Sequence, residues 1–205
     1  MVARVQKGKM KHELMSSARL EAFSDGVIAI IITIMVLDLR APVGGGTGAL
    51  LALWPVFLSY ALSFLIVAIY WMNHHRTFHL VKLVDNAILW CNIALLFCLS
   101  LIPFATAYMG ENHMSSLSVA LYCAVLMVCT MAFTGMRTAM ARHFGEDAQL
   151  RAWNRAASHK SWFATAVYGA GIPLAFFSPT LSLVLLFSIA AIYFVPGFGM
   201  GKLAK

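Results

Sequence analysis

Charged residues are scarce in this sequence. Only 11% of its 205 residues are Asp, Glu, Lys or Arg, against about 25% in an average soluble domain, and 61% are hydrophobic. This composition excludes an ordinary soluble domain and predicts a polytopic membrane protein. The formal net charge of +7 is therefore interpreted as loop charge that orients helices in a bilayer, and we expect no nucleic-acid partner.

The sequence also lacks a cysteine motif of the metal-binding or redox type. Its four cysteines lie inside apolar runs, with no CxxC pair and no neighbouring histidine at ligand spacing: Cys91, Cys98, Cys123 and Cys129. We interpret them as small buried hydrophobic residues. We expect no cofactor, no bound metal and no catalytic residues.

Six apolar runs, each about 20 residues long and thus able to cross a bilayer, dominate the chain. They predict an all-α membrane protein with six transmembrane helices, in which Pro103 and Pro173 kink the third and fifth. The predicted spans are 19–39, 49–73, 86–109, 116–136, 161–178 and 180–198. Residues 1–18 and 199–205 are then a cytoplasmic segment and tail on either side of a transmembrane domain, 19–198.

Basic residues mark alternate linkers between these runs. Fourteen of the 15 Lys and Arg residues lie on one side of the predicted membrane, and only Arg40 lies on the other. By the positive-inside rule both termini are cytoplasmic, and the protein is a multi-pass protein of the inner (plasma) membrane. The second helix is expected to continue beyond the bilayer through His79. Residues 139–160 are expected to extend the fourth helix and then form a short amphipathic piece.

The first apolar run begins with a polar stretch, Arg19-x3-Phe23-Ser24-Asp25-Gly26. On a helical wheel at about 100° per residue, Asp25 lies nearly opposite Ile30. A carboxylate at that depth is costly unless donors surround it. We therefore favour the hypothesis that Ser24 and Asp25 anchor this helix to its neighbours over a carboxylate that reaches into the headgroups. The candidate partners are Trp71, His74, His75 and Asn92.

The opposite stripe of the same helix has two interpretations. A row of Ile30, Ile34 and Leu37 is ordinarily a packed or lipid-facing surface, and the residues alone favour that interpretation. If several copies of the helix meet at a symmetry axis, the row becomes stacked apolar rings that gate a pore by dewetting. Thr33 would add a ring of hydroxyls, unless its hydroxyl is bonded to the carbonyl of Ala29 one turn back.

Histidines offer two further functions. Seven of them, together with Asp25, could relay protons in a proton-conducting channel or a proton-coupled transporter. His74, His75 and His79 could be ligands of a membrane metalloenzyme, since His75 and His79 have the i, i+4 spacing of a ligand pair. No second histidine or carboxylate pair elsewhere in the sequence completes such a site.

The polar stretch resembles a signature of the bacterial branch of the transmembrane protein 175 family. The resemblance extends to Thr33 and Leu37 downstream of it, and to Trp71 and His74-His75 at the end of the second run. These proteins are prokaryotic relatives of the endolysosomal potassium channel. The resemblance implies a homotetramer of six-helix subunits around a central pore lined by the first helix. It implies a passive potassium-permeable channel with a modest preference for K⁺ over Na⁺, whose partners are potassium ions, the bilayer and its own copies.

The resemblance also assigns roles to residues. Ile30 is the narrowest constriction, Ile34 and Leu37 line the pore beyond it, and Thr33 matches a threonine that favours potassium in some bacterial members. The residues that match the signature holding the pore helix are Arg19, Phe23, Ser24 and Asp25, with Trp71 and either His74 or His75 as partners. The sequence has no Thr-Val-Gly-Tyr-Gly stretch, so selectivity cannot come from the carbonyl rings of other potassium channels.

Overall fold

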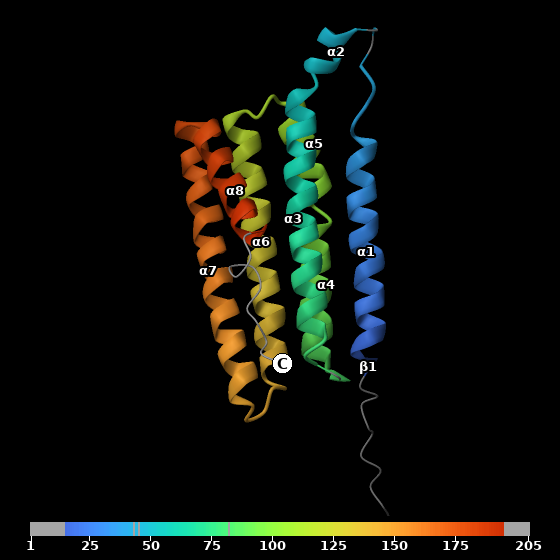
Figure 1. Ribbon diagram of the computed structural model, residues 1–205, viewed down its shortest axis with the longest axis vertical. Helices are drawn as coiled ribbons and strands as arrows, with labels where there is room; N and C mark the ends of the chain where they lie inside the picture. The colour runs from blue at the N-terminus through green and yellow to red at the C-terminus, as the bar shows by residue number, and fades with distance from the viewer. Residues whose placement is uncertain (1–14, 43, 45, 82, 195–205) are drawn as a thin grey trace, which may run out of the picture.

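A computed structural model describes residues 15–42, 44, 46–81 and 83–194, so most of the predicted terminal segments 1–18 and 199–205 lie outside the described residues. Its long helices stand side by side along the long axis of the molecule (Figure 1). The described elements are β1 Met15–Ser16, α1 Ser17–Leu37, α2 Thr47–Leu51, α3 Trp54–Phe78, β2 Leu83–Val84, α4 Asn86–Leu99, α5 Ile102–Glu111, α6 Ser116–Ala141, α7 Ala148–Phe177 and α8 Pro179–Phe194.

Four helical segments of the described chain are long and apolar enough to cross a membrane. They are α1, α3, the pair α4–α5 over residues 86–111, and α6. The prediction of a helical membrane protein is confirmed for these four runs. The apolar stretch of α8, Pro179–Ile192, is shorter, and α7 begins with a polar half.

Prolines place two helix boundaries. The second span begins at Trp54 and not at residue 49, because Pro55 favours the first turn of a helix while residues 47–51 form the separate helix α2. The predicted extension of this span is confirmed, since α3 runs to Phe78 with His79 as its C-cap. Pro103 lies in the first turn of α5, so the third span is broken between Leu99 and Ile102.

The region between the fourth and fifth spans differs from its prediction. Helix α6 ends at Ala141 and α7 starts at Ala148, after a turn in which Gly145 has a φ of +55°. The Asp147 side chain accepts hydrogen bonds from the backbone N–H groups of Gln149 and Leu150, which fixes the start of α7. The expected short amphipathic piece is therefore wrong, because its residues are the first turns of one 30-residue helix.

Arg137 is a buried structural residue and not a loop charge. Its side chain is 4% exposed, and its guanidinium donates to Ser158 Oγ at 2.8 Å and to the carbonyl oxygen of Asn154 at 3.2 Å. The rings of Phe133 and Trp153 lie 5.9 and 6.0 Å from its central carbon. These contacts tie α6 to α7, and the sequence count of cytoplasmic charge did not reveal them.

Helix α1 lies at one edge of the bundle and α7 at the other (Figure 1). Helix α1 packs against α3, α4 and α5, while α6 packs most extensively against α7. A two-residue antiparallel pairing, which the all-α prediction did not include, joins Met15 to Val84 and Ser16 to Leu83. We call the end of the bundle that carries this pairing the strand end.

Gly110 permits a close approach of α5 to α3. A Cβ added at Gly110 would lie 2.9 Å from the backbone Cα of Val56, whereas one added at Gly135 would meet nothing within 4 Å. We expect Gly110→Ala to lower the melting temperature of the purified protein in detergent, because two backbones would have to separate. Gly135→Ala is the matched control and should be neutral or slightly stabilising, since Ala is favoured over Gly in helices by up to about 1 kcal/mol. Equal melting temperatures for the two variants would contradict the close packing.

Asp85 caps α4 at the strand end, outside the membrane-spanning helices. Its Oδ1 accepts from the Ile88 backbone N–H at 2.8 Å and its Oδ2 lies 3.1 Å from His143 Nε2. The capping N–H, followed by His143, holds the pKa of the Asp85 carboxyl below its usual range.

A carboxyl whose pKa is lowered on folding adds stability that is present above its ordinary pKa and is lost as the pH falls through the folded value. We expect the stability advantage of the wild type over Asp85→Asn, which keeps a capping side chain, to be constant near pH 7 and to shrink below about pH 4. Melting temperatures measured across this range check the expectation. An advantage that is independent of pH would contradict it.

Candidate functional site

Helix α1 has two distinct faces. Leu20, Ser24, Ile28, Ile31 and Met35 are buried against the neighbouring helices. On the other face Ile30 is 58% exposed, Ile34 45% and Leu37 75%. The predicted apolar stripe is therefore a surface of this chain and is not part of its core.

Polar residues share the exposed side of α1. Arg19 and Thr33 are exposed there together with Phe23. The Thr33 hydroxyl donates to the carbonyl oxygen of Ile30 at 2.9 Å, and not to that of Ala29. Because this bond uses the single hydrogen of the hydroxyl, the Thr33 oxygen retains acceptor capacity toward a cation.

A buried chain of hydrogen bonds holds the inner face of α1. The Ser24 hydroxyl donates to the Leu20 carbonyl at 2.8 Å and accepts from Asn92 Nδ2 on α4 at 2.9 Å. Asn92 Oδ1 in turn lies 2.9 Å from His74 Nε2 on α3. An amide oxygen only accepts, so His74 Nε2 carries the hydrogen of this bond. Ser24, Asn92 and His74 thus join three helices within a buried site.

Asp25 makes a second contact at the edge of this site. The indole Nε1 of Trp71 donates to Asp25 Oδ1 at 2.9 Å, and the Trp71 ring stacks on His75 with centroids 5.8 Å apart. Both side chains are partly exposed, so this bond is weaker than the buried chain. All four candidate partners thus lie beside the start of α1, although only Trp71 contacts Asp25 directly.

The two adjacent histidines have different surroundings. His74 is buried, stacks on Phe78 at a centroid distance of 4.4 Å and reaches Ser24 through Asn92. His75 Nδ1 lies 2.7 Å from Glu21 Oε1, and His75 Nε2 lies 3.0 Å from His79 Nε2. Sequence reasoning missed Glu21. Its position one turn before Asp25, on the same face of α1, was the available signal.

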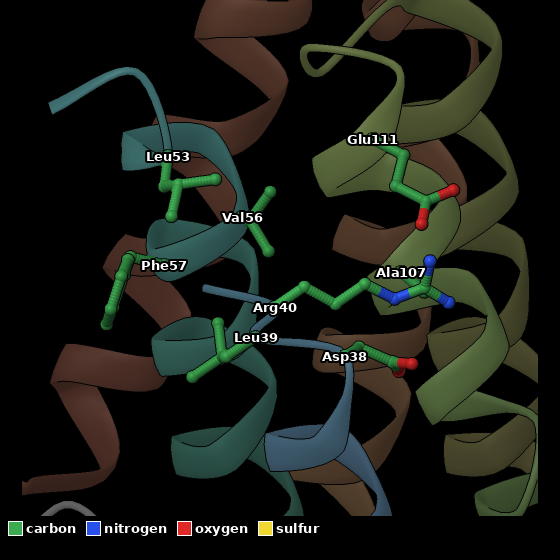
Figure 2. A pocket seen from close by; sticks show the side chains of 8 residues that line it. All are labelled: Asp38, Leu39, Arg40, Leu53, Val56, Phe57, Ala107 and Glu111. Carbon is green, nitrogen blue, oxygen red and sulfur yellow. The ribbon is translucent and has the colours of Figure 1, made fainter. Parts of the chain in front are cut away.

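The opposite end of α1 opens onto a pocket between α1, α3 and α5. The side chain of Arg40 extends toward the carboxylates of Asp38 and Glu111, which come from different elements (Figure 2). Charged groups of both signs therefore gather just beyond Leu37. The lining residues are Asp38, Leu39, Arg40, Leu53, Val56, Phe57, Ala107 and Glu111.

These observations define a helical membrane protein whose first helix is held from one side by polar contacts and presents an apolar face on the other. A family model described as the endosomal/lysosomal potassium channel TMEM175 matches residues 19–103, which include the signature and its partners on α3 and α4. A protein named as a potassium channel in Chryseobacterium sp. (strain P1-3) is 41% identical over 191 residues, which are 93% of this chain and 99% of that protein. The chain belongs to the TMEM175 family.

Two further relatives extend the comparison. The crystal structure of a lysosomal potassium-selective channel TMEM175 homolog from Chamaesiphon minutus matches with a TM-score of 0.75 and 31% identity, over 85% of this chain and 94% of that one. The human endosomal/lysosomal proton channel TMEM175 is 30% identical over 187 residues, which are 83% of this chain but only 37% of the human protein.

Asn92 is the middle member of the buried chain, with one hydrogen bond to Ser24 on α1 and one to His74 on α3. We expect Asn92→Ala to lower the free energy of unfolding by about 2 kcal/mol or more, because the His74 N–H and the Ser24 hydroxyl each lose a buried partner. Unfolding in detergent micelles measures the effect. Asn112→Ala is the control, since among the described residues the partner of the exposed Asn112 amide is the Tyr108 carbonyl one turn back in the same helix. A loss no larger than that of the control would contradict the anchoring role.

Proposed function

We propose that this protein is a passive potassium-permeable cation channel, with a modest preference for K⁺ over Na⁺, formed by four copies of the chain. The observation that carries the proposal is the exposed stripe of Ile30, Ile34 and Leu37 on a helix whose other face is fixed by buried polar contacts. The relative that is 41% identical over nearly its whole length is named a potassium channel, which favours a pore-lining stripe over a lipid-facing one.

In the proposed assembly, α1 from each subunit surrounds the central axis. Ile30 side chains form the narrowest ring. A ring of large apolar side chains blocks ions because it excludes the water that would hydrate them. Thr33 lies one turn further along the exposed side. Four Thr33 oxygens, their hydrogens donated to the backbone, would present lone pairs to a dehydrating cation. Such a ring is a weaker discriminator than stacked carbonyl rings, so selectivity is modest.

The orientation follows from charge and helix length. Helices α7 and α8 complete six spans, since the last half of α7 and the apolar stretch of α8 lie beside α6. The strand end carries Arg19, Arg76 and the basic residues of the α6–α7 region, while Arg40 lies beyond the other end of α1. The positive-inside rule then puts the strand end and both termini in the cytoplasm, in the inner (plasma) membrane.

A proton channel is the second candidate, because the vertebrate relatives are named endosomal/lysosomal proton channels. The titratable side chains of the signature region contact neighbouring helices and not the exposed stripe: Glu21 and Asp25 contact His75 and Trp71 on α3, and His74 contacts Asn92 on α4. A proton pathway through them would therefore run inside each subunit. This geometry favours the potassium channel, whose pathway follows the stripe.

Ion flux into liposomes containing the purified protein tests the proposal. We expect potassium flux to exceed sodium flux in the wild type and to rise several-fold in Ile30→Asn, because a polar ring hydrates the constriction. Ile93→Asn, an exposed apolar position on α4, is the matched control and should leave flux unchanged. Size-exclusion profiles should show that all three proteins keep the same assembly.

Two results would overturn this proposal. Proton flux without potassium or sodium flux would establish the second candidate and remove Ile30 from the gate. An equal increase for Ile30→Asn and Ile93→Asn would show that polar substitutions merely make the protein leak.

A further inference from the structure

Three ligand-type side chains converge at the strand end, between α1 and α3. Glu21 lies in the second turn of α1, and His75 and His79 lie one turn apart at the end of α3. Each offers one nitrogen or oxygen atom, and these three atoms lie within 4.8 Å of one another. The anchoring chain through His74 and the stripe of α1 use none of the three.

Two atoms of this cluster are buried without a hydrogen bond. Glu21 Oε1 and His75 Nδ1 are 2.7 Å apart, yet the contact lacks hydrogen-bond geometry and neither atom has another partner among the described residues. The two atoms are paired with each other as an ion pair, and a carboxylate beside imidazole nitrogens is a common set of zinc ligands. Glu21 faces His75 Nδ1 and His79 faces His75 Nε2, and each of the three residues offers one atom that can bind a metal.

The cluster is close in size to a tetrahedral metal site, since its three ligand atoms lie within 4.8 Å of one another. Zinc binds nitrogen and carboxylate oxygen at about 2.0–2.2 Å, which places the ligand atoms about 3.3 Å apart. His75 Nε2 and His79 Nε2 are 3.0 Å apart, and their rings are nearly perpendicular at 87°. Because Glu21 and His79 lie at opposite nitrogens of the His75 ring, the side chain of Glu21 or of His79 must rotate before one ion can contact all three residues. Imidazole nitrogens select Zn²⁺ and related transition metals over K⁺ or Mg²⁺, which prefer oxygen.

The exposure of these side chains would allow a metal ion to enter the site from solvent. The Glu21 side chain is 15% exposed and that of His75 is 44% exposed, while His79 is exposed at the C-cap of α3. Two His and one Glu leave the fourth position to water, as in other three-ligand zinc sites. The Trp71 ring, held by Asp25, stacks on His75 and limits its rotation.

We propose that Glu21, His75 and His79 form a binding site for a divalent transition metal of the Zn²⁺ class, which clamps the start of α1 to the end of α3. The sequence left His75 and His79 without a third ligand, and the fold brings Glu21 to them from 54 residues earlier in the chain. A metal that binds only the folded protein also stabilises it. A consequence that rests on the proposed channel function is that the bound metal restrains α1 and so lowers ion flux.

Equilibrium dialysis with Zn²⁺, on purified full-length protein from which any affinity tag has been removed, tests the site. We expect about one zinc per chain, a raised melting temperature, and the visible absorption of tetrahedral cobalt when Co²⁺ replaces Zn²⁺. His79→Ala and Glu21→Gln should each weaken binding by about tenfold or more. His159→Ala removes an exposed histidine of α7 and should bind zinc like the wild type.

Zinc binding that is equally strong in wild type, His79→Ala and Glu21→Gln would overturn the site, as would its absence from the wild type. A variant that is less stable could lose zinc simply because it unfolds. The cobalt spectrum avoids this problem, because it is measured on the wild-type protein and reports tetrahedral coordination directly. Flux measured with zinc and with a chelator tests the consequence separately. Full binding without a change in flux would leave the site established and remove its effect on the channel.

Discussion

The requirement that buried polar groups find partners fixes the position of the first helix. Ser24, Asn92 and His74 lie on three different helices, and they are joined by hydrogen bonds in a buried region. Rotating α1 by even one residue position would remove Ser24 from Asn92 and leave polar atoms buried in an apolar site. The hydrogen-bond chain therefore determines not only that α1 is held but also which of its residues remain outside.

The two faces of α1 are thus consequences of a single arrangement. Once Ser24 points inward, the 3.6-residue period of the helix places Ile30, Ile34 and Leu37 on the outside. Polar residues on a membrane helix are costly, and this chain gathers them near one end, where α3 and α4 supply donors. The apolar stripe needs no such partners and is exposed on the surface of the chain.

Sequence reasoning found the parts of this site that depend on local periodicity. The helical wheel separated Asp25 from Ile30, and the position of Trp71, His74 and His75 near the end of the second apolar run predicted that they lie beside the start of the first helix, as they do. It missed Glu21 because an acidic residue near a helix start has an ordinary local explanation and its partner lies 54 positions away. It misread Arg137 for the reverse reason, since loop charge is the usual role of Arg near a membrane and only the α6–α7 packing shows that it is buried. The start of α3 and the pairing of β1 with β2 depend on the path of the backbone, which apolar runs do not encode.

The pairing of β1 with β2 has a mechanical consequence. Strand β1 ends where α1 begins, and β2 is followed directly by the cap of α4. The pairing of the two strands therefore holds the N-termini of α1 and α4 at the same level along the bundle axis. Sliding α1 along its axis by one turn, about 5.4 Å, would break this pairing, whereas tilting α1 about its foot would not. In such a tilt Leu37, at the far end of a helix about 30 Å long, travels further than Ile30, and Phe23 hardly moves. A tilt of α1 about its N-terminus would therefore move the apolar stripe most at the end farthest from the strand pairing.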